Sequence, residues 1–234
     1  MMPGATQGSV NVTSIQTFDY SHLFANQNAT AGGAITVGVL SDSHIPFRQA
    51  TMPTKVSEWF SDCNLILHAG DLEDPDILVA LRALAPTHAV AGNIHWTYAS
   101  GTHDLDMPRQ LSIIAGSHHI WMTHGHWNFR HTFIDKVNVA TRFGVGKLGL
   151  PVRGRTLQMA NIDIVNRLAN YKPGTASVVI FGHTHARLAL VRAGTLYFNP
   201  GAVVGAEGGL APRSIGKLHL FPDGRMDHEW TDLP

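Results

Sequence analysis

Five short polar motifs in this sequence contain residue types that can bind metal ions. Each combines aspartate, asparagine or histidine with glycine or with a second histidine. In chain order they are Asp42-Ser43-His44, Gly70-Asp71, Gly92-Asn93, His124-Gly125-His126 and Gly182-His183-Thr184-His185. Carboxylate, amide and imidazole groups together suit Mn, Fe, Zn or Ni. Each motif alone is ordinary, because Asp and Asn also cap helices, Gly-Asp and Gly-Asn occur in turns, and a lone histidine is more often structural.

The positions of the motifs carry more information than the motifs themselves. Each motif follows an apolar run that predicts a buried strand, and these runs cover residues 35–40, 65–67, 88–91, 119–122 and 178–181. Helical spacing of apolar residues over 55–60 and after Pro75 predicts helices between the first three strands, and therefore βαβ units in a largely parallel sheet. Because ligands bind beyond the carboxyl ends of parallel strands, we expect the motifs to meet at one rim.

The second half of the chain has shorter, more alternating apolar runs. They predict strands at 111–114, 119–122, 188–192, 196–198, 215–220 and 226–230. Their hairpin-like spacing favours antiparallel pairing. We therefore expect an α/β protein with a parallel first half and an antiparallel second half.

In their order, the five motifs resemble those of the calcineurin-like metallophosphoesterase superfamily. The compact Gly92-Asn93 motif, the stretch 197–202 and the later Pro212-Arg213-Ser214 are most similar to small phosphodiesterases of the YfcE/MJ0936 type. The resemblance runs from about Ile35 to the C-terminus, with one basic interruption. It implies an α+β sandwich of two packed mixed β-sheets flanked by helices, in four layers.

The resemblance also implies two divalent transition-metal ions, with Mn as the expected metal and Fe, Zn or Ni as alternatives. The implied ligands are Asp42, His44 and His185 for the first ion, Asn93, His124 and His183 for the second, and Asp71 as the bridge. A metal-bridging hydroxide would attack the phosphate ester. Because two divalent ions outweigh two aspartates and one hydroxide, the site would keep a positive charge for an anionic substrate.

The sequence departs from the superfamily pattern directly after Gly92-Asn93. Many members have a histidine there that assists the leaving group, whereas this chain has Ile94, and the small phosphodiesterases commonly lack that histidine as well. His95 and His126 are candidate proton donors, because imidazole titrates near neutral pH. Structural roles are the alternative for both residues.

A basic insertion occupies about residues 127–172. Lysine and arginine outnumber acidic residues there, although the whole chain is neutral, with 17 basic and 17 acidic side chains. Because the insertion follows a candidate ligand loop, we hypothesise a partial lid in which Arg130 contacts substrate phosphate. A solvated helical face is the alternative.

The remaining features describe the chain as a whole. With 234 residues and 44% hydrophobic content, it can bury one substantial core. Residues 1–33 are small and polar and predict a flexible tail, leaving 34–234 as a single metallophosphoesterase domain. No apolar run is long enough to cross a bilayer, and the lone Cys63 fits a reducing compartment, so we expect a cytoplasmic protein without a membrane partner.

We expect a metal-dependent phosphoesterase, and within this class a phosphodiesterase that acts on a phosphate-ester small molecule or a nucleotide. A phosphomonoesterase or a nuclease is the alternative among enzymes, although the balanced charge does not indicate a nucleic-acid partner. A noncatalytic metal-binding scaffold resembling the retromer subunit Vps29 is the alternative outside enzymes. The intact ligand set favours an enzyme. No sequence feature locates an oligomer interface.

Overall fold

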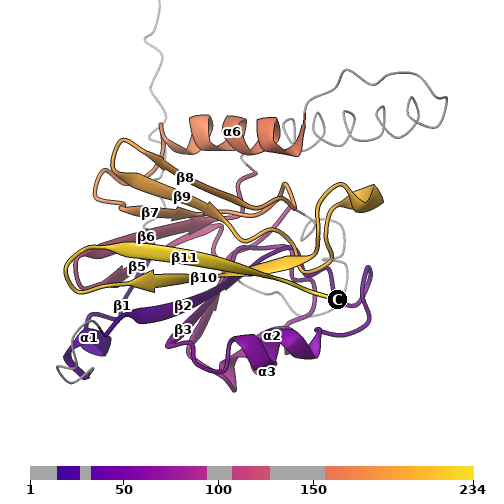
Figure 1. Cartoon of the computed structure of the whole chain (residues 1–234), viewed down its shortest axis with the longest axis horizontal. Coiled ribbons are helices and arrows are strands. Elements are labelled where there is room, and N and C mark those ends of the chain that lie inside the picture. Colours follow the sequence, from indigo (N-terminus) through magenta and orange to yellow (C-terminus); the bar gives the residue numbers. More distant parts are fainter. Residues whose placement is uncertain (1–14, 27–32, 94–106, 127–155) are drawn as a thin grey trace, which may run out of the picture.

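The computed structural model describes residues 15–26, 33–93, 107–126 and 156–234. Within these ranges a six-stranded and a five-stranded β-sheet lie face to face, and helices cover their outer faces (Figure 1). The elements are β1 Gln16–Asp19, α1 His22–Asn26, β2 Ile35–Leu40, α2 Thr54–Trp59, β3 Leu65–His68, α3 Asp76–Arg82, β4 Thr87–Ala89, β5 Gln110–Ala115, β6 His118–Thr123, α6 Leu157–Leu168, β7 Val178–Ile180, β8 Leu188–Arg192, β9 Thr195–Asn199, η1 Glu207–Gly209, β10 Ser214–Leu220 and β11 Met226–Asp232.

Each sheet contains three neighbouring parallel strands. The five-stranded sheet has the order β11-β10-β2-β3-β4, in which β2, β3 and β4 are parallel. The six-stranded sheet has the order β1-β5-β6-β7-β9-β8, in which β6, β7 and β9 are parallel. The carboxyl ends of each parallel triplet therefore lie at one edge of its sheet.

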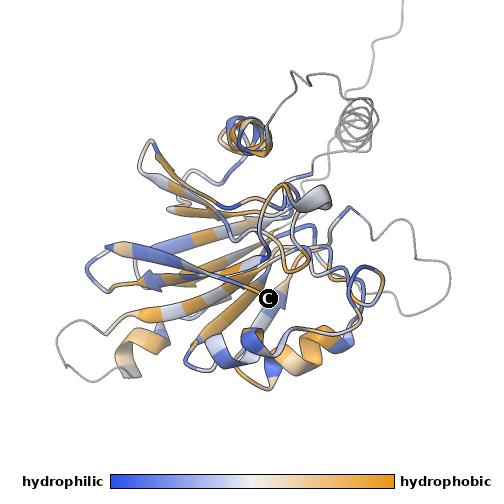
Figure 2. Cartoon of the chain, turned by 45° about the vertical axis from the view of Figure 1, so that its right-hand side comes forward, coloured by the Kyte–Doolittle hydropathy of each residue, from blue (hydrophilic) through white to orange (hydrophobic). Residues whose placement is uncertain are grey.

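Side chains on alternate sides of each strand pack into different layers of the fold. In β6, Ile120 and Met122 enter the core between the sheets, whereas Trp121 faces the helix side. In β3, Leu67 enters the same central core, whereas Ile66 packs with residues of α2 and α3. Successive strand residues point to opposite faces of a sheet. Because apolar side chains occupy consecutive positions in these strands, each sheet buries both of its faces. Figure 2 shows the resulting hydrophobic stretches along the strands. The predicted sandwich of two mixed sheets flanked by helices is confirmed.

Helix α6 forms the outer layer on the six-stranded sheet. Its N-terminus is capped by Thr156, whose side chain accepts a hydrogen bond from the backbone N–H of Met159. Ile164, Val165 and Leu168 recur at helical spacing and pack against the outer face of the sheet. The C-terminal part of the basic insertion is therefore a packed layer and not a wholly solvated face. Residues 127–155, including Arg130, lie outside the described residues.

The N-terminal segment differs from the expected flexible tail. Strand β1 pairs in parallel with β5 at the edge of the six-stranded sheet. Phe18, Leu23 and Phe24 pack against the central core, and the hydroxyl of Tyr20 lies 2.8 Å from Nε2 of His88. The expectation was wrong for residues 16–26 because averaging composition over 33 residues concealed these aromatic and apolar side chains.

The expectation of an antiparallel second half is correct for some strand pairs and wrong for others. Strands β8 and β9 are antiparallel, as are β10 and β11. However, β9 lies between β7 and β8 and runs parallel to β7. Strand β10 belongs to the five-stranded sheet, where it lies beside β2. The alternating pattern of a strand gives its two faces but not its neighbour, so the sequence did not distinguish these pairings.

In the described part of the chain, no helix combines the length and the apolar character that a bilayer crossing requires.

Candidate metal centre

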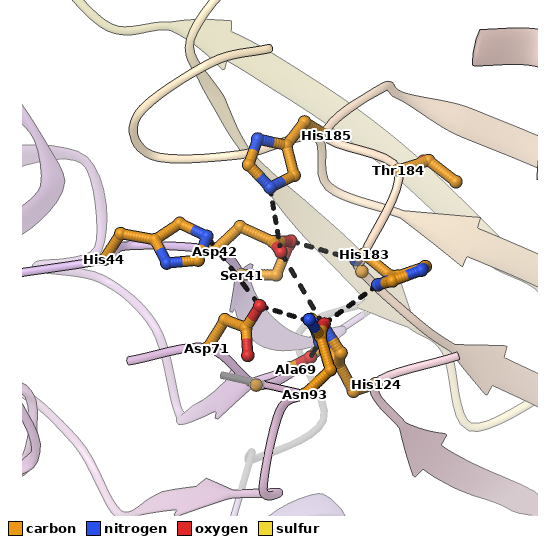
Figure 3. A network of polar contacts seen from close by, with 12 residues as sticks. Ser41, Asp42, His44, Ala69, Asp71, Asn93, His124, His183, Thr184 and His185 are labelled. Carbon is orange, nitrogen blue, oxygen red and sulfur yellow. Dashed lines mark hydrogen bonds and ion pairs between the residues drawn. The ribbon is translucent and has the colours of Figure 1, made fainter. Parts of the chain in front are cut away.

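The structure brings all seven predicted ligand residues together where the two parallel triplets end (Figure 3). They come from the loops that follow five strands. Asp42 and His44 follow β2, Asp71 follows β3, Asn93 follows β4, His124 follows β6, and His183 and His185 follow β7. The side chains of Asp42, His44, Asp71 and His124 are almost completely buried.

One group of ligand atoms gathers around Asp42. Side-chain donor atoms of Asp42, His44 and His185 all lie within 4.8 Å of one another. The shortest approach joins Nε2 of His185 to Oδ1 of Asp42, at 3.2 Å. These are the three residues that the resemblance implies for the first ion.

A second group gathers around the side-chain oxygen of Asn93. This Oδ1 atom lies 2.9 Å from Nε2 of His124 and 3.0 Å from Nδ1 of His183. Oδ2 of Asp71 lies between the two groups, 3.3 Å from Nε2 of His124 and 3.8 Å from Nε2 of His44. Asp71 thus lies within 4 Å of a histidine from each group, and Oδ1 of Asp42 also lies 3.8 Å from Nε2 of His124.

These atoms fit divalent metal ions in spacing and in chemistry. Two ligands bonded at about 2.1 Å and at right angles lie about 3 Å apart, which matches the contacts between the donor atoms. Oδ1 of Asp42 and Nε2 of His44 are buried without a well-aligned hydrogen bond to any described residue. Buried polar atoms rarely stay unsatisfied, so such atoms facing one another indicate a cation-binding position.

Three of the histidines direct a ring nitrogen into the site because the other ring nitrogen is held from outside. Nδ1 of His124 lies 2.7 Å from the carbonyl oxygen of Ala69, and Nδ1 of His185 lies 2.6 Å from that of Gly205. Nδ1 of His44 lies 2.6 Å from Oε1 of Glu73. Since all three outer partners accept hydrogen bonds, the neutral form of each imidazole has its proton on Nδ1 and its lone pair on Nε2. Sequence reasoning did not find Glu73, and no motif marks it.

Ligand residues on three of these loops adopt left-handed backbone conformations. The φ angles are 52° at Asp42, 45° at His44, 56° at Asp71, 70° at His183 and 59° at His185. Residues other than glycine enter this region at a cost of about 1–2 kcal/mol each. Such strained residues cluster at functional sites, where the surrounding structure holds them in place.

The glycines of the motifs permit close approach between the loops. A Cβ atom on Gly92 would lie 1.8 Å from Oδ1 of Asp71, and one on Gly182 would lie 2.7 Å from Oδ2 of Asp42. Neither glycine has a positive φ angle, so the need for a left-handed turn does not explain them. At these two positions the glycine leaves room for a ligand carboxylate.

A buried network of side chains holds the loop that carries His183 and His185. The amide nitrogen of Asn199 donates to the carbonyl oxygen of Gly182 at 3.1 Å and to the hydroxyl of Thr184 at 3.0 Å. This hydroxyl donates to Oδ1 of Asn161 on α6, at 2.6 Å. Sequence reasoning gave Asn199 no role of its own within the stretch 197–202 and did not single out Asn161, because a single buried asparagine leaves no periodic signal.

The aspartates and histidines of the centre stabilise one another's charged forms. Burial alone would raise the pKa of Asp42 and Asp71, but the facing histidines hold the pKa of both carboxyls well below its usual range. Burial alone would lower the pKa of His124, but Asp71 and Asp42 raise it to about 9. The carboxylates are therefore ionised, and in the metal-free protein His124 retains a proton that a bound cation would displace.

His126, one of the two candidate proton donors, is placed less favourably for that role than the sequence suggested. His126 lies beside His124 and His183, with ring centroids 5.4 and 6.4 Å away. Burial, followed by the charges of these two histidines, lowers the pKa of His126 to about 3. Near neutral pH, His126 lacks the proton that a general acid needs. His95 lies outside the described residues, so the role of each stays a prediction.

His68 supports the ligand loops from outside the candidate ligand set. It is buried, Nε2 lies 3.0 Å from the hydroxyl of Ser43, and Nδ1 accepts the backbone N–H of Gly70 at 3.3 Å. Both ring nitrogens are used in holding the first two loops together. Neither is available as a ligand.

Curated proteins with similar sequences are described as metallophosphoesterases. The chain is 42% identical over 89 residues to a probable metallophosphoesterase from Methanothermobacter thermautotrophicus, which is 38% of this chain and 49% of that protein. It spans about half the length of the curated relatives it matches.

Solved structures share the fold at low sequence identity. Vacuolar Protein Sorting 29 from Cryptosporidium parvum matches with a TM-score of 0.55 at 18% identity, over 86% of this chain and 98% of that one. A conserved uncharacterized protein from Streptococcus pneumoniae, described as a predicted phosphoesterase, matches with a TM-score of 0.50 at 19% identity, also over 86% and 98%. The model of the calcineurin-like phosphoesterase superfamily domain matches residues 35–219. The chain therefore belongs to the calcineurin-like phosphoesterase superfamily.

Proposed function

We propose that this protein is a hydrolase with a dinuclear metal site, and that it cleaves phosphodiesters of small molecules or nucleotides. The observation that carries the proposal is the position of Asp71 between two groups of ligand atoms. Its Oδ2 atom approaches His124 of one group at 3.3 Å and His44 of the other at 3.8 Å. A mononuclear site would not need a carboxylate shared between two groups.

The proposed ligands are those of the resemblance: Asp42, His44 and His185 for one ion, Asn93, His124 and His183 for the other, and Asp71 for both. Divalent ions held there, with Mn²⁺ as the first choice, supply Lewis acidity toward phosphoryl oxygens and a nucleophile at neutral pH. The mixture of carboxylate, imidazole and one neutral amide suits such ions.

The chain itself contributes fixed geometry, charge and a direction of access. Asp42 and His124 have no exposed surface and form the floor of the site. Asn93, His183 and His185 are partly exposed, so we infer that substrate reaches the site past these three residues. Because the loops are already held by hydrogen bonds, the ligand atoms need little rearrangement during the reaction.

The first experiment measures hydrolysis of bis(p-nitrophenyl) phosphate by metal-stripped protein reloaded with Mn²⁺. We expect metal-dependent turnover that falls at least about 100-fold in Asp71→Asn, because a shared ligand would be lost. Asp227→Asn is the matched control. This exposed aspartate lies on β11 opposite His219 of β10. On its other side His219 pairs with Thr36, which is at the start of β2 and far from the loop that follows Leu40.

Metal counting and a substrate panel separate the alternatives. Two bound ions without turnover of any phosphate ester would favour the noncatalytic scaffold, a role consistent with the fold shared with the vacuolar sorting protein. Faster cleavage of p-nitrophenyl phosphate, or of single-stranded nucleic acid, would replace the phosphodiesterase with a phosphomonoesterase or a nuclease. Fewer than two ions in active protein would refute the dinuclear site.

A further inference from the structure

Glu73, which is not among the proposed ligands, contacts His44 from the side opposite the metal centre. Its Oε1 atom lies 2.6 Å from Nδ1 of His44, and the two side chains are only 6% and 1% exposed. The other ring nitrogen of His44, Nε2, faces Oδ2 of Asp71 at 3.8 Å. His44 thus lies between a carboxylate of the site and a carboxylate outside it.

The contact fixes which nitrogen of His44 carries the proton. An ionised carboxylate only accepts hydrogen bonds, so Nδ1 must donate to Glu73. In neutral imidazole the lone pair is then on Nε2, the atom that is buried without a hydrogen-bond partner among the described residues. This is the tautomer that can bind a metal ion through Nε2.

His44 differs in this respect from the other two histidines that present Nε2. Those residues, His124 and His185, donate to the backbone carbonyls of Ala69 and Gly205. A hydrogen bond to a charged acceptor is stronger than one to a carbonyl group. A carboxylate partner also makes the imidazole a better metal ligand. Among these three histidines, His44 alone has such a partner.

Two features of Glu73 are unfavourable for a residue that only joins loops. Its φ angle is 69°, in the left-handed region, and its Oε2 atom is buried without a hydrogen-bond partner among the described residues. The loops that it connects are already joined by the backbone, since the N–H of His44 donates to the carbonyl of Asp71 at 3.1 Å. The carboxylate is therefore not needed as a tether.

We propose that Glu73 is a positioning residue that sets the divalent-ion affinity of the position formed by Asp42, His44 and His185. The inference rests on the proposed function, because it requires that ions bind at this centre. Glu73 acts through His44: it holds the ligating tautomer and adds negative charge behind the ring. The position formed by Asn93, His124 and His183 does not depend on it.

The test is a titration of chelator-stripped, full-length protein with Mn²⁺, followed by electron paramagnetic resonance of the free ion. We expect two bound ions in the wild type. In Glu73→Gln, one of them should bind about 10–100-fold more weakly, because the amide can donate to Nδ1 and move the ring proton to Nε2. Asp74→Asn is the control, since it removes the neighbouring charge without touching a histidine, and we expect a change below about threefold.

A double-mutant cycle identifies the affected position. In a His44→Ala background, Glu73→Gln should cause no further loss of affinity, because its contact is already absent. In an Asn93→Ala background, Glu73→Gln should lower the Mn²⁺ affinity by the same factor as it does in the wild-type protein. Glu73→Asp keeps the charge at a longer distance, and we expect a loss at the same position that is smaller than that of Glu73→Gln. This variant decides the question if Glu73→Gln does not fold.

The outcomes separate this inference from the proposed function. The role of Glu73 is overturned if the glutamine variant, or the aspartate variant in its place, binds both ions like the wild type. It is also overturned if Asp74→Asn has an equal effect, or if the loss persists in the His44→Ala background. A wild-type chain that binds no divalent ion would instead refute the proposed function.

Discussion

Loops 41–44 and 182–185, which meet at the side chain of Asp42, differ in how far backbone and side-chain contacts hold them in place. The loop 41–44, after β2, has two backbone hydrogen bonds to the loop after β3: the N–H of Asp42 donates to the carbonyl of Gly70 at 2.9 Å, and that of His44 to the carbonyl of Asp71 at 3.1 Å. The side chains of Ser41 and Ser43 add further bonds. The loop 182–185, after β7, has one backbone bond to another ligand loop, from the N–H of Gly182 to the carbonyl of His124 at 3.2 Å, and is otherwise held by the buried side chains of Asn199, Thr184 and Asn161.

This difference has consequences for how the centre responds to substitution. Every residue except proline has a backbone N–H, so loop 41–44 keeps these bonds when most side chains change. A side-chain network is lost when one member is replaced, and its partners then stay buried and unpaired. We therefore expect the part of the centre that contains His183 and His185 to be the more sensitive to replacement of supporting residues.

The largest expected effect is that of Asn199→Ala, which breaks the network of loop 182–185. It removes the hydrogen bonds of the Asn199 amide to Gly182 and Thr184, and it leaves the N–H of Gly201, which donates to Oδ1 of Asn199 at 2.9 Å, without that partner; the carbonyl of Gly182 keeps the N–H of Thr184 at 2.8 Å. One buried unpaired donor and the lost hydrogen bonds cost about 2–5 kcal/mol together. Urea unfolding measures the loss, and Mn²⁺ titration should show weaker binding. Asn170→Ala, an exposed change after α6, should alter stability by less than about 0.5 kcal/mol; equal effects would contradict the comparison.

The next effect concerns His124 in chelator-treated protein. Its folded-state pKa of about 9 lies above the usual value of 6.5. The protonated His124 therefore stabilises the folded state fully below pH 6.5. This contribution, on the order of 3 kcal/mol, is lost as the pH rises toward 9. Unfolding by urea at pH 6.5, 7.5 and 8.5 (roughly spanning this window) measures the slope. The pKa of His185 is also raised, because Asp42 outweighs the effect of burial, so His124→Gln should reduce the slope and bound metal should abolish it. A slope unchanged in the variant would disprove the assignment to His124.

The smallest expected effect on stability tests the packing between the loop after β4 and the loop that carries Asp71. In Gly92→Ala, the new Cβ would lie 1.8 Å from Oδ1 of Asp71 and 2.3 Å from its backbone nitrogen, so the backbone of one of the two loops must move. Overpacking of this kind costs about 1–3 kcal/mol, and a displacement of about 1 Å in Asp71 should lower activity about 100-fold. Gly174→Ala has open space and should be neutral or slightly stabilising in thermal unfolding. Equal activity of the two variants would contradict a steric role for Gly92.

Sequence reasoning predicted the ligand loops because their signals are local. The predicted run 35–40 coincides with β2, and the strand expected at 65–67 lies within β3, each followed directly by its motif. An apolar run that ends in a polar motif depends only on residues adjacent in the chain, and parallel packing places such strand ends together. The ligand roles themselves stay predictions that the metal experiments test.

The supporting residues were not predictable in this way. Glu73 lies 29 positions from His44, and Asn161 lies 38 positions from Asn199. The periodicity of α6 predicts its buried face, but it does not show that one polar residue on that face would contact a ligand loop. The N-terminal strand escaped notice for a related reason, since its partner β5 is almost a hundred residues away, with Gln16 opposite Leu111.

The sequence by itself determined the strand-end motifs, their order and the chemical types of the candidate ligands, because these depend on neighbouring residues and on the preferences of metal ions. Only the tertiary structure decided that two parallel triplets meet, that Asp71 lies between two groups of donors, and that Glu73 and Asn199 support them. These contacts join residues far apart in the chain, and they exist only once both sheets have packed around one core.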